Sequence, residues 1–182
     1  MQEDSTGKTP RVESLRAVIR RIEWFIERGG MVLRWFVVAF VLTMAYEVIS
    51  RYVFNAPTVW SYDISYMLGG GMIVLGGAYL IYRDGHVRID IIYGRLSPRK
   101  RLIVDMALWL VFFLPMVLIL TDSSFHYAVR AWKYNEVSAI WIWRPPLFPF
   151  KATIFVAWCL VLLEGVCWFV KDLLKLVTGE ET

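Results

Sequence analysis

Four long apolar segments, separated by shorter polar ones, organise the chain. They cover residues 31–50, 61–82, 102–122 and 152–170. Each has about the 20 residues that an α-helix needs to cross the roughly 30 Å hydrocarbon core of a bilayer. The remaining segments are too short to form a soluble domain. The pattern therefore predicts an all-α membrane protein with four transmembrane helices, flanked by an N-terminal segment of residues 1–30 and a tail of residues 171–182.

The composition supports this class. Hydrophobic residues make up 58% of the chain and aromatic residues 16%, more than a soluble domain of 182 residues carries. The net charge of +4 follows from an uneven distribution of Lys and Arg between the two sides of the membrane. We therefore predict no nucleic-acid partner.

Most Lys and Arg residues fall on one predicted side of the membrane. The N-terminal segment, residues 83–101 and the tail together hold fourteen of them, whereas the other two connections hold five. The positive-inside rule therefore predicts that both termini are cytoplasmic. The connections around residues 51–60 and 123–151 would then lie outside, in the periplasm if the host is a Gram-negative bacterium.

The N-terminal segment shows no sign of a cleaved signal peptide, because it is polar and the following apolar run is long enough to span. Within residues 12–26, apolar side chains recur at helical spacing, while Arg16, Arg20 and Arg21 occupy other positions. This predicts an amphipathic helix lying on the cytoplasmic leaflet. A charged, disordered tail is the alternative.

The second apolar segment carries a packing signal, LGGGMIVLGGA at residues 68–78. Gly69 and Gly76 are seven residues apart, as are Gly70 and Gly77, so each pair lies on one stripe of the helix. Small residues on a stripe let another helix approach closely, which is how helices associate in lipid. The partner can be a helix of the same chain or of a second subunit.

Several ionisable residues lie within the predicted spans, where charges are costly and are usually paired or functional. Arg34, Asp105 and Glu164 share the cytoplasmic depth, so an Arg34 pair with either carboxylate would hold helices together. At the external end, Glu47 precedes Arg51 by four residues, the favourable order for a helical ion pair. We prefer structural pairing to a direct part in ion movement.

The sequence lacks motifs for catalysis or cofactor binding. His86 and His126 lie on opposite predicted sides of the membrane, so one haem cannot bridge them. Cys159 and Cys167 are separated by roughly 12 Å along one helix, too far for a disulfide. No HExxH, GxSxG or Cys/His cluster is present. We therefore predict neither an enzyme nor a cofactor. A stand-alone, proton-coupled small exporter and the membrane anchor of a redox complex stay open as alternatives.

Two motifs give the chain a resemblance to a known family. The first runs from Arg51 to Asn55 and continues to Trp60. The second comprises Arg83, Gly85, His86, Val87 and Asp90. Together with the glycine-rich helix, they resemble the small membrane subunit of tripartite ATP-independent periplasmic (TRAP) transporters, the DctQ family, over roughly residues 31–170. One departure is that residues 62–63 are Tyr-Asp, where the family commonly has a glutamate pair.

This resemblance implies a function. Members of the family work with a large membrane subunit, which carries the sodium and substrate sites and moves as an elevator, and with a soluble periplasmic binding protein. The chain would be the small permease subunit of a secondary, sodium-coupled importer of an organic acid in the bacterial inner membrane. It would scaffold the large subunit, help to dock the binding protein and contact membrane lipids. The stretch WIWRPPLFPFKATIF resembles a branch associated with monocarboxylic or aromatic acids.

The first motif is interpreted as a rigid external hairpin between the first two helices. Arg51 can cap the C-terminal end of the first helix, and Asn55 belongs to the turn. Trp60 would anchor the second helix at the membrane interface, and Asp63 would lie in its first turn, within reach of Arg51. The matching role at the cytoplasmic end of the second helix is assigned to Arg83, His86 and Asp90.

The long connection of residues 123–151 combines aromatic and basic side chains. It begins with a helical pattern, so the third helix is expected to project past the bilayer, with a bend at Pro115. Such side chains suit both anchoring at the membrane interface and contact with a binding protein, and both interpretations stay open. The residues concerned are Arg130, Trp132, Lys133, Trp141 and Arg144.

Overall fold

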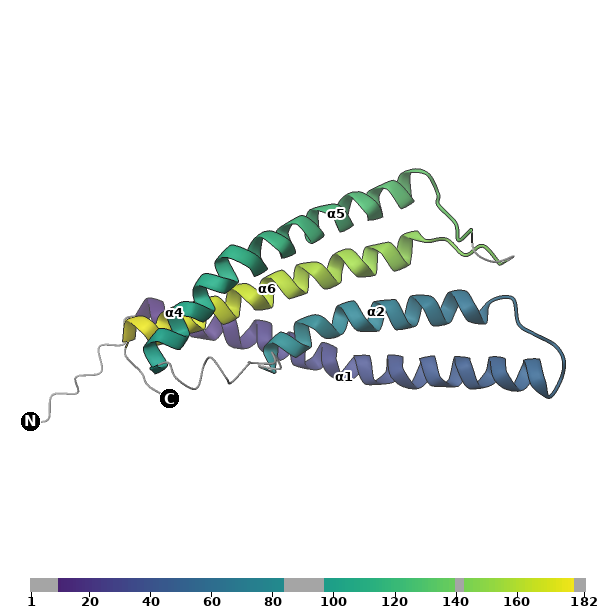
Figure 1. Ribbon diagram of the computed structural model, residues 1–182, viewed down its shortest axis with the longest axis horizontal. Helices are drawn as coiled ribbons and strands as arrows, with labels where there is room; N and C mark the ends of the chain where they lie inside the picture. Colours follow the sequence, from purple (N-terminus) through teal and green to yellow (C-terminus); the bar gives the residue numbers. More distant parts are fainter. Residues whose placement is uncertain (1–9, 84–96, 140–142, 179–182) are drawn as a thin grey trace, which may run out of the picture.

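A computed structural model describes residues 10–83, 97–139 and 143–178. The elements are α1 (Pro10–Tyr52), α2 (Ser61–Tyr82), α4 (Pro98–Leu108), the π-helical turn η1 (Trp109–Phe113), α5 (Leu114–Lys133) and α6 (Phe148–Thr178). Because α4, η1 and α5 form one continuous rod, the described residues make four helical rods (Figure 1). Each rod is long and apolar enough to cross a membrane. The predicted all-α class, with four helices long and apolar enough to span a membrane, is therefore confirmed.

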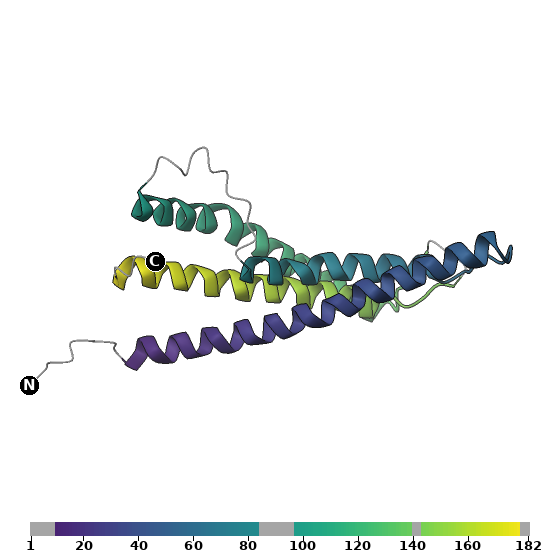
Figure 2. The ribbon, with the colours of Figure 1, turned by 90° about the horizontal axis from the view of Figure 1, so that it is seen from below.

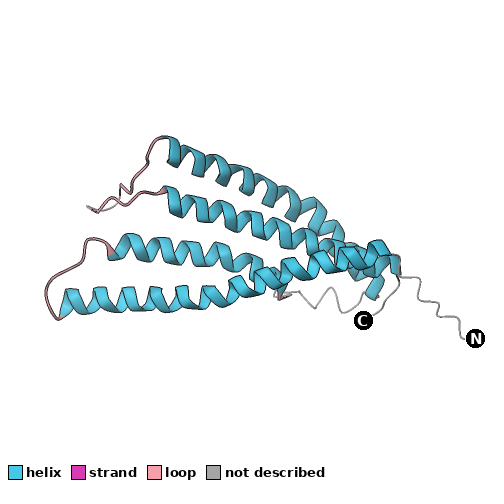
Figure 3. Ribbon diagram, turned by 180° about the vertical axis from the view of Figure 1, so that it is seen from behind, coloured by secondary structure: helices cyan, strands magenta, loops and turns pink. Residues whose placement is uncertain are grey.

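The rods lie side by side with alternating directions. α2 packs against both α1 and α6, and α5 packs against α6 (Figures 1 and 3). The α1–α2 turn and the α5–α6 connection lie at one end of the bundle, which we call the hairpin end. The start of α1 and the finish of α6 lie at the opposite end, the terminal end (Figure 1). The cytoplasmic location of the terminal end stays a prediction.

The first helix is longer than predicted. The sequence suggested a separate interfacial helix before residue 31, but α1 is a single helix of 43 residues, about 65 Å long at 1.5 Å per residue. It crosses α2 and α6 obliquely as one rod (Figure 2). Ile19 and Ile26 are buried, and Ile26 belongs to the hydrophobic core with Ala78 and Val161. These two positions of the amphipathic pattern are therefore largely covered by the chain itself, and the placement of this part of α1 on the cytoplasmic leaflet stays a prediction.

The third rod bends where the sequence places a proline. Its axis changes direction between α4 and α5 (Figure 1), and the π-helical turn ends two residues before Pro115. Proline lacks an N–H and its ring clashes with the carbonyl four residues earlier, and a π-helical turn is one way in which a helix absorbs such a disruption. Trp109 in this turn stacks on Phe169 of α6, with ring centroids 4.7 Å apart.

The glycines of α2 bring neighbouring helices close. A Cβ added at Gly70 would lie 3.1 Å from the ring of Phe150 in α6, and one at Gly77 would lie 3.4 Å from Val161. A Cβ at Gly69 would lie 3.5 Å from the Phe40 ring of α1, whereas one at Gly76 would meet no atom within 4 Å in the part of the chain that the structure describes. Three of the four glycines thus face helices of the same chain, and Gly76 faces open space.

This difference predicts unequal effects of enlarging Gly77 and Gly76. Gly77→Leu should force its side chain into Val161 and lower the unfolding free energy by about 1–3 kcal/mol, as overpacking typically does. Gly76→Leu is the matched control, because the same side chain would enter open space. Thermal unfolding of the purified chain, followed by tryptophan fluorescence, measures both. Equal losses in the two variants would show that the α2–α6 contact does not depend on the small residue.

Candidate functional site at the hairpin end

One carboxylate closes the turn between α1 and α2. Glu47 accepts hydrogen bonds from Arg51, at 3.0 Å from Nε and 2.5 Å from Nη2. It also accepts from the backbone N–H of Thr58, at 3.1 Å, and from the Thr58 hydroxyl. The ion pair expected from the four-residue spacing is therefore present. Through Thr58, which sequence reasoning missed, it ties the end of α1 to the segment that leads into α2.

The turn itself needs an unusual backbone conformation. Asn55 has φ of +48°, a left-handed conformation that Asn tolerates better than most residues. The backbone N–H of Ala56 donates to the carbonyl of Ser50 at 3.0 Å. Trp60 stacks on Tyr46 of α1, with ring centroids 5.7 Å apart. Asn55 and Trp60 thus both fix how α2 leaves α1, so the described contacts make the turn a defined structure.

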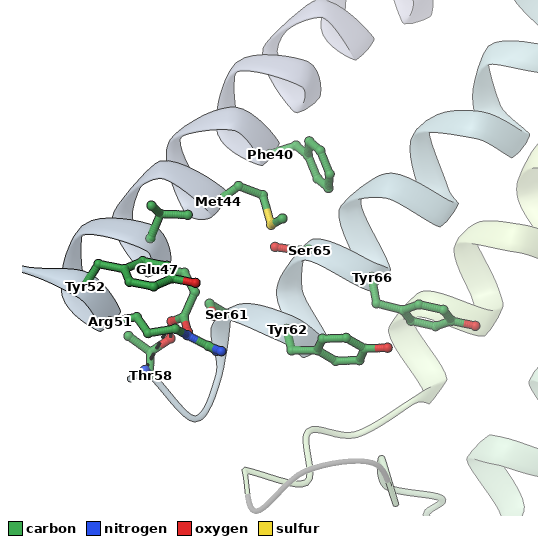
Figure 4. Close-up of a pocket in the computed structure, with 11 residues that line it drawn as sticks. Phe40, Met44, Glu47, Arg51, Tyr52, Thr58, Ser61, Tyr62, Ser65 and Tyr66 are labelled. Atoms are coloured by element: carbon green, nitrogen blue, oxygen red, sulfur yellow. Dashed lines mark hydrogen bonds and ion pairs between the residues drawn. The ribbon is translucent and has the colours of Figure 1, made fainter. Parts of the chain in front are cut away.

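A cavity of about 450 Å³ lies between α1 and α2 beside this turn (Figure 4). Glu47 and Arg51 line it near the turn, and Phe40 and Met44 line it further along α1. Ser65 contributes a buried hydroxyl that has no hydrogen-bond partner among the described residues. The described part of the chain contains no group of three His, Cys, Asp or Glu residues that could hold a metal ion. The cavity offers an apolar groove without a catalytic set.

Asp63 serves a different partner from the one predicted. Its side chain is only 2% exposed, and its Oδ1 accepts a hydrogen bond of 2.7 Å from the Ser138 hydroxyl. Arg51, the predicted partner, is directed to Glu47 instead. Sequence separation explains the miss, because Ser138 lies 75 residues away on the α5–α6 connection. Asp63 therefore joins α2 to that connection.

The α5–α6 connection is folded back on itself in its described part. Val137 and Pro146 form an isolated antiparallel bridge. The Ser138 N–H donates to the Pro145 carbonyl at 2.9 Å, and the Leu147 N–H donates to the Glu136 carbonyl at 2.9 Å. These backbone bonds give the two arms of the connection a fixed relation to each other.

A buried cation holds this connection to the helices. Lys151, near the start of α6, is 3% exposed and pairs with Glu136. Its Nζ lies 3.6 Å from the centroid of the Tyr127 ring, so a carboxylate and an aromatic face both compensate the buried charge. Glu136 also accepts from Arg130 Nε at 3.0 Å. From the sequence, Lys151 was counted only among the charges of the connection, and Glu136 was not singled out. The two residues are 15 positions apart, a spacing that does not predict a contact along one helix.

The contacts with Lys151 and Arg130 lower the pKa of Glu136. The hydrogen bond from Lys151, followed by that from Arg130, holds the pKa of Glu136 below its ordinary value of 4.5. A carboxyl group whose pKa is lowered by folding contributes stability that is present above its ordinary pKa and is lost as the pH falls through the folded value. The anchoring contact is therefore intact at neutral pH and weakens only in acid.

The residues predicted to meet a binding protein have distinct environments. Trp132 is 67% exposed, and its ring lies 4.6 Å from that of Phe148. Lys133 lies over the ring of Tyr134, at 6.0 Å from its centroid. Arg144 is exposed and has φ of +46°, whereas Arg130 is exposed but bound to Glu136. Trp141 lies outside the described residues.

The predicted residues of the terminal end are partly described. Arg83 donates from Nε to the Tyr79 hydroxyl at 3.1 Å. Arg34 also approaches the Tyr79 hydroxyl as a hydrogen-bond donor, and its expected pairing with Glu164 or Asp105 stays a prediction. Asp105 and Glu164 each make a contact within the structure, so neither carboxylate is without a partner. His86 and Asp90 lie outside the described residues.

The buried pair makes a prediction about stability. Glu136→Ala should leave the Lys151 ammonium group buried without its carboxylate, and the melting temperature should fall by roughly 5–10 °C. Replacing both partners, as Glu136→Ala with Lys151→Met, should recover most of this loss because no uncompensated charge stays buried. Tryptophan fluorescence during heating of the purified chain provides the measurement.

Asp122→Ala is the matched control, because the Asp122 side chain is 73% exposed. Its contact with His126, at 3.7 Å, also joins two exposed groups. It should leave the melting temperature nearly unchanged. A Glu136→Ala variant as stable as this control would contradict the anchoring role, as would a double variant less stable than the single one.

The comparisons with known proteins agree with this architecture. The family model described as "Tripartite ATP-independent periplasmic transporters, DctQ component" matches residues 40–175, which is more than half of the chain and includes the whole hairpin end. No curated protein matches the sequence. Members of this family are components of transporters, not enzymes, and function with a large membrane subunit and a binding protein. The chain therefore belongs to the DctQ family, the small membrane components of TRAP transporters.

Proposed function

We propose that this chain is a fixed scaffold for the large subunit of a sodium-coupled TRAP importer of an organic acid, and that its hairpin end helps to dock the periplasmic binding protein. The membrane would be the bacterial inner membrane, with the terminal end in the cytoplasm. The observation that carries this proposal is an exposed group of basic and aromatic side chains on a connection that is anchored by a buried ion pair.

The scaffold role is supported by an uncovered face of α2. A Cβ added at Gly76 would meet nothing within 4 Å among the described residues, and its helical neighbours Ile73 and Leu80 are 74% and 51% exposed. A small residue flanked by apolar ones suits close approach of another helix in lipid. We assign this face to the large subunit, while Gly70 and Gly77 serve packing within the chain.

The docking role is supported by the rigidity of the hairpin end. The Glu47 contacts fix the α1–α2 turn, and the Glu136 contacts fix the α5–α6 connection. A surface that is already ordered loses little conformational entropy when a soluble protein binds. Exposed aromatic and arginine side chains such as Trp132 and Arg144 are typical of protein contacts. Trp132 also suits the membrane interface, so membrane anchoring is the competing role of this surface.

The alternatives raised by the sequence fit less well. The family match is to a component of TRAP transporters. It therefore supports neither a stand-alone small exporter nor the membrane anchor of a redox complex. Sodium coupling and an organic acid solute rest on the family resemblance, and the solute-binding groups would belong to the large subunit. The contacts of Glu47, Asp63 and Glu136 lie at the hairpin end, where they fix the turn and the connection between helices.

Co-purification from the native host tests the scaffold role. A tagged full chain, cross-linked briefly with formaldehyde and solubilised in mild detergent, should recover one large polytopic protein and a soluble periplasmic protein, both identified by mass spectrometry. Gly76→Leu should reduce recovery of the large protein several-fold without lowering the melting temperature of the chain, because it blocks close approach of a partner helix. Unchanged recovery would remove the α2 face from the proposed interface.

Charge reversal tests the docking role separately. Lys133→Glu with Arg144→Glu should reduce recovery of the soluble protein by roughly tenfold, since like charges across an interface are strongly unfavourable, while the large protein is retained. Arg130 is left intact because it binds Glu136. The matched control is Arg99→Glu with Lys100→Glu, an equal reversal at exposed positions of the terminal end. Equal recovery of the soluble protein in both variants would contradict docking and favour membrane anchoring.

A further inference from the structure

We propose that a basic cavity at the terminal end binds the phosphate headgroup of an anionic phospholipid. The cavity has a volume of about 290 Å³ and lies between the first part of α1 and the last part of α6. Four cationic side chains line it, Arg16 and Arg20 from α1 and Lys171 and Lys175 from α6. This site does not depend on the transport role proposed above.

The lining of this basic cavity includes one carboxylate, Glu23, beside the four cations. Glu23 pairs with Lys171, and Lys175 pairs with Asp172 at 3.1 Å. Arg16 and Arg20 are four residues apart on one helix, where like charges repel. An anion placed between the two helices would relieve this repulsion and would meet guanidinium groups, whose planar donors match phosphate oxygens.

The position of the cavity fits the headgroup layer. Lys171 directly follows the predicted span of residues 152–170, and Lys175 comes one helical turn later, about 6 Å further along the axis. The Glu23–Lys171 pair brings α1 to the same depth. Trp24 and Phe25 of α1 are 58% and 60% exposed, and aromatic side chains gather where headgroups meet hydrocarbon. A lipid phosphate can therefore reach the cavity from the membrane.

The apolar part of the lining favours a lipid over a free phosphate ion. Ile19 and Leu174 contribute to the same cavity, and an inorganic ion gains nothing from apolar side chains. The glycerol and upper acyl carbons of a phospholipid would contact them. Basic cavities between helices are known recognition sites for anionic headgroups, so the geometry and the charges indicate the same ligand.

Native mass spectrometry tests this proposal on the tagged full chain, purified in mild detergent with its bound partners. Titration with phosphatidylglycerol should give a saturable lipid adduct, and phosphatidylcholine should not. Arg16→Gln with Arg20→Gln should weaken phosphatidylglycerol binding by roughly tenfold. The matched control, Arg99→Gln with Lys100→Gln, removes two exposed positive charges from α4 outside the cavity and should bind like the unmodified chain.

The other outcomes overturn the proposal. Equal loss of binding in both variants would mean that lipid follows overall charge and not this cavity. Unchanged binding in the Arg16 and Arg20 variant would place the lipid elsewhere. A thermal stabilisation by inorganic phosphate that matches that by phosphatidylglycerol, and that disappears in the same variant, would identify a free anion as the ligand. A folding check is provided by the melting temperature, which should not fall because both arginines lie at least partly in solvent.

Discussion

Close packing of α2 against α6 is the constraint on which the other features of this molecule depend. Hydrocarbon provides no hydrophobic drive between helices, so association in a membrane depends on contact area and on polar ties. Gly70 and Gly77 let α6 approach α2, and Ala78 and Val161 form part of the resulting core. With this pair in place, α1 packs mainly against α2, and α5 packs against α6 (Figure 1).

Polar contacts fix the ends of this bundle. Glu47 holds the α1–α2 turn, while Asp63 and Glu136 hold the α5–α6 connection through Ser138 and Lys151. A carboxylate near the end of a helix can therefore act as a pin for a loop, with no part in moving an ion. The hairpin end becomes an ordered surface on a helical frame, which is the property expected of a scaffold that meets other proteins.

Sequence periodicity was sufficient to predict the four rods and their class, because the bilayer imposes helix length and apolarity directly. It also predicted the Glu47–Arg51 pair, since that contact is local. It failed for Asp63–Ser138 and Glu136–Lys151, where partners far apart along the chain meet only after the helices have packed. The extent of α1 was missed for a related reason: the apolar positions at Ile19 and Ile26 indicate a buried face, but the pattern alone does not distinguish a membrane surface from α2 and α6.

Side-specific labelling tests the central claim, that the hairpin end is the outer, protein-facing end of a fixed frame. In a background with Cys159 and Cys167 replaced by Ala, Tyr134→Cys and Val177→Cys introduce single thiols at positions that are 68% and 76% exposed. A membrane-impermeant maleimide applied to spheroplasts should label Tyr134→Cys directly and Val177→Cys only after permeabilisation. Labelling of Val177→Cys in intact spheroplasts, with Tyr134→Cys protected, would place the hairpin end in the cytoplasm and contradict the account.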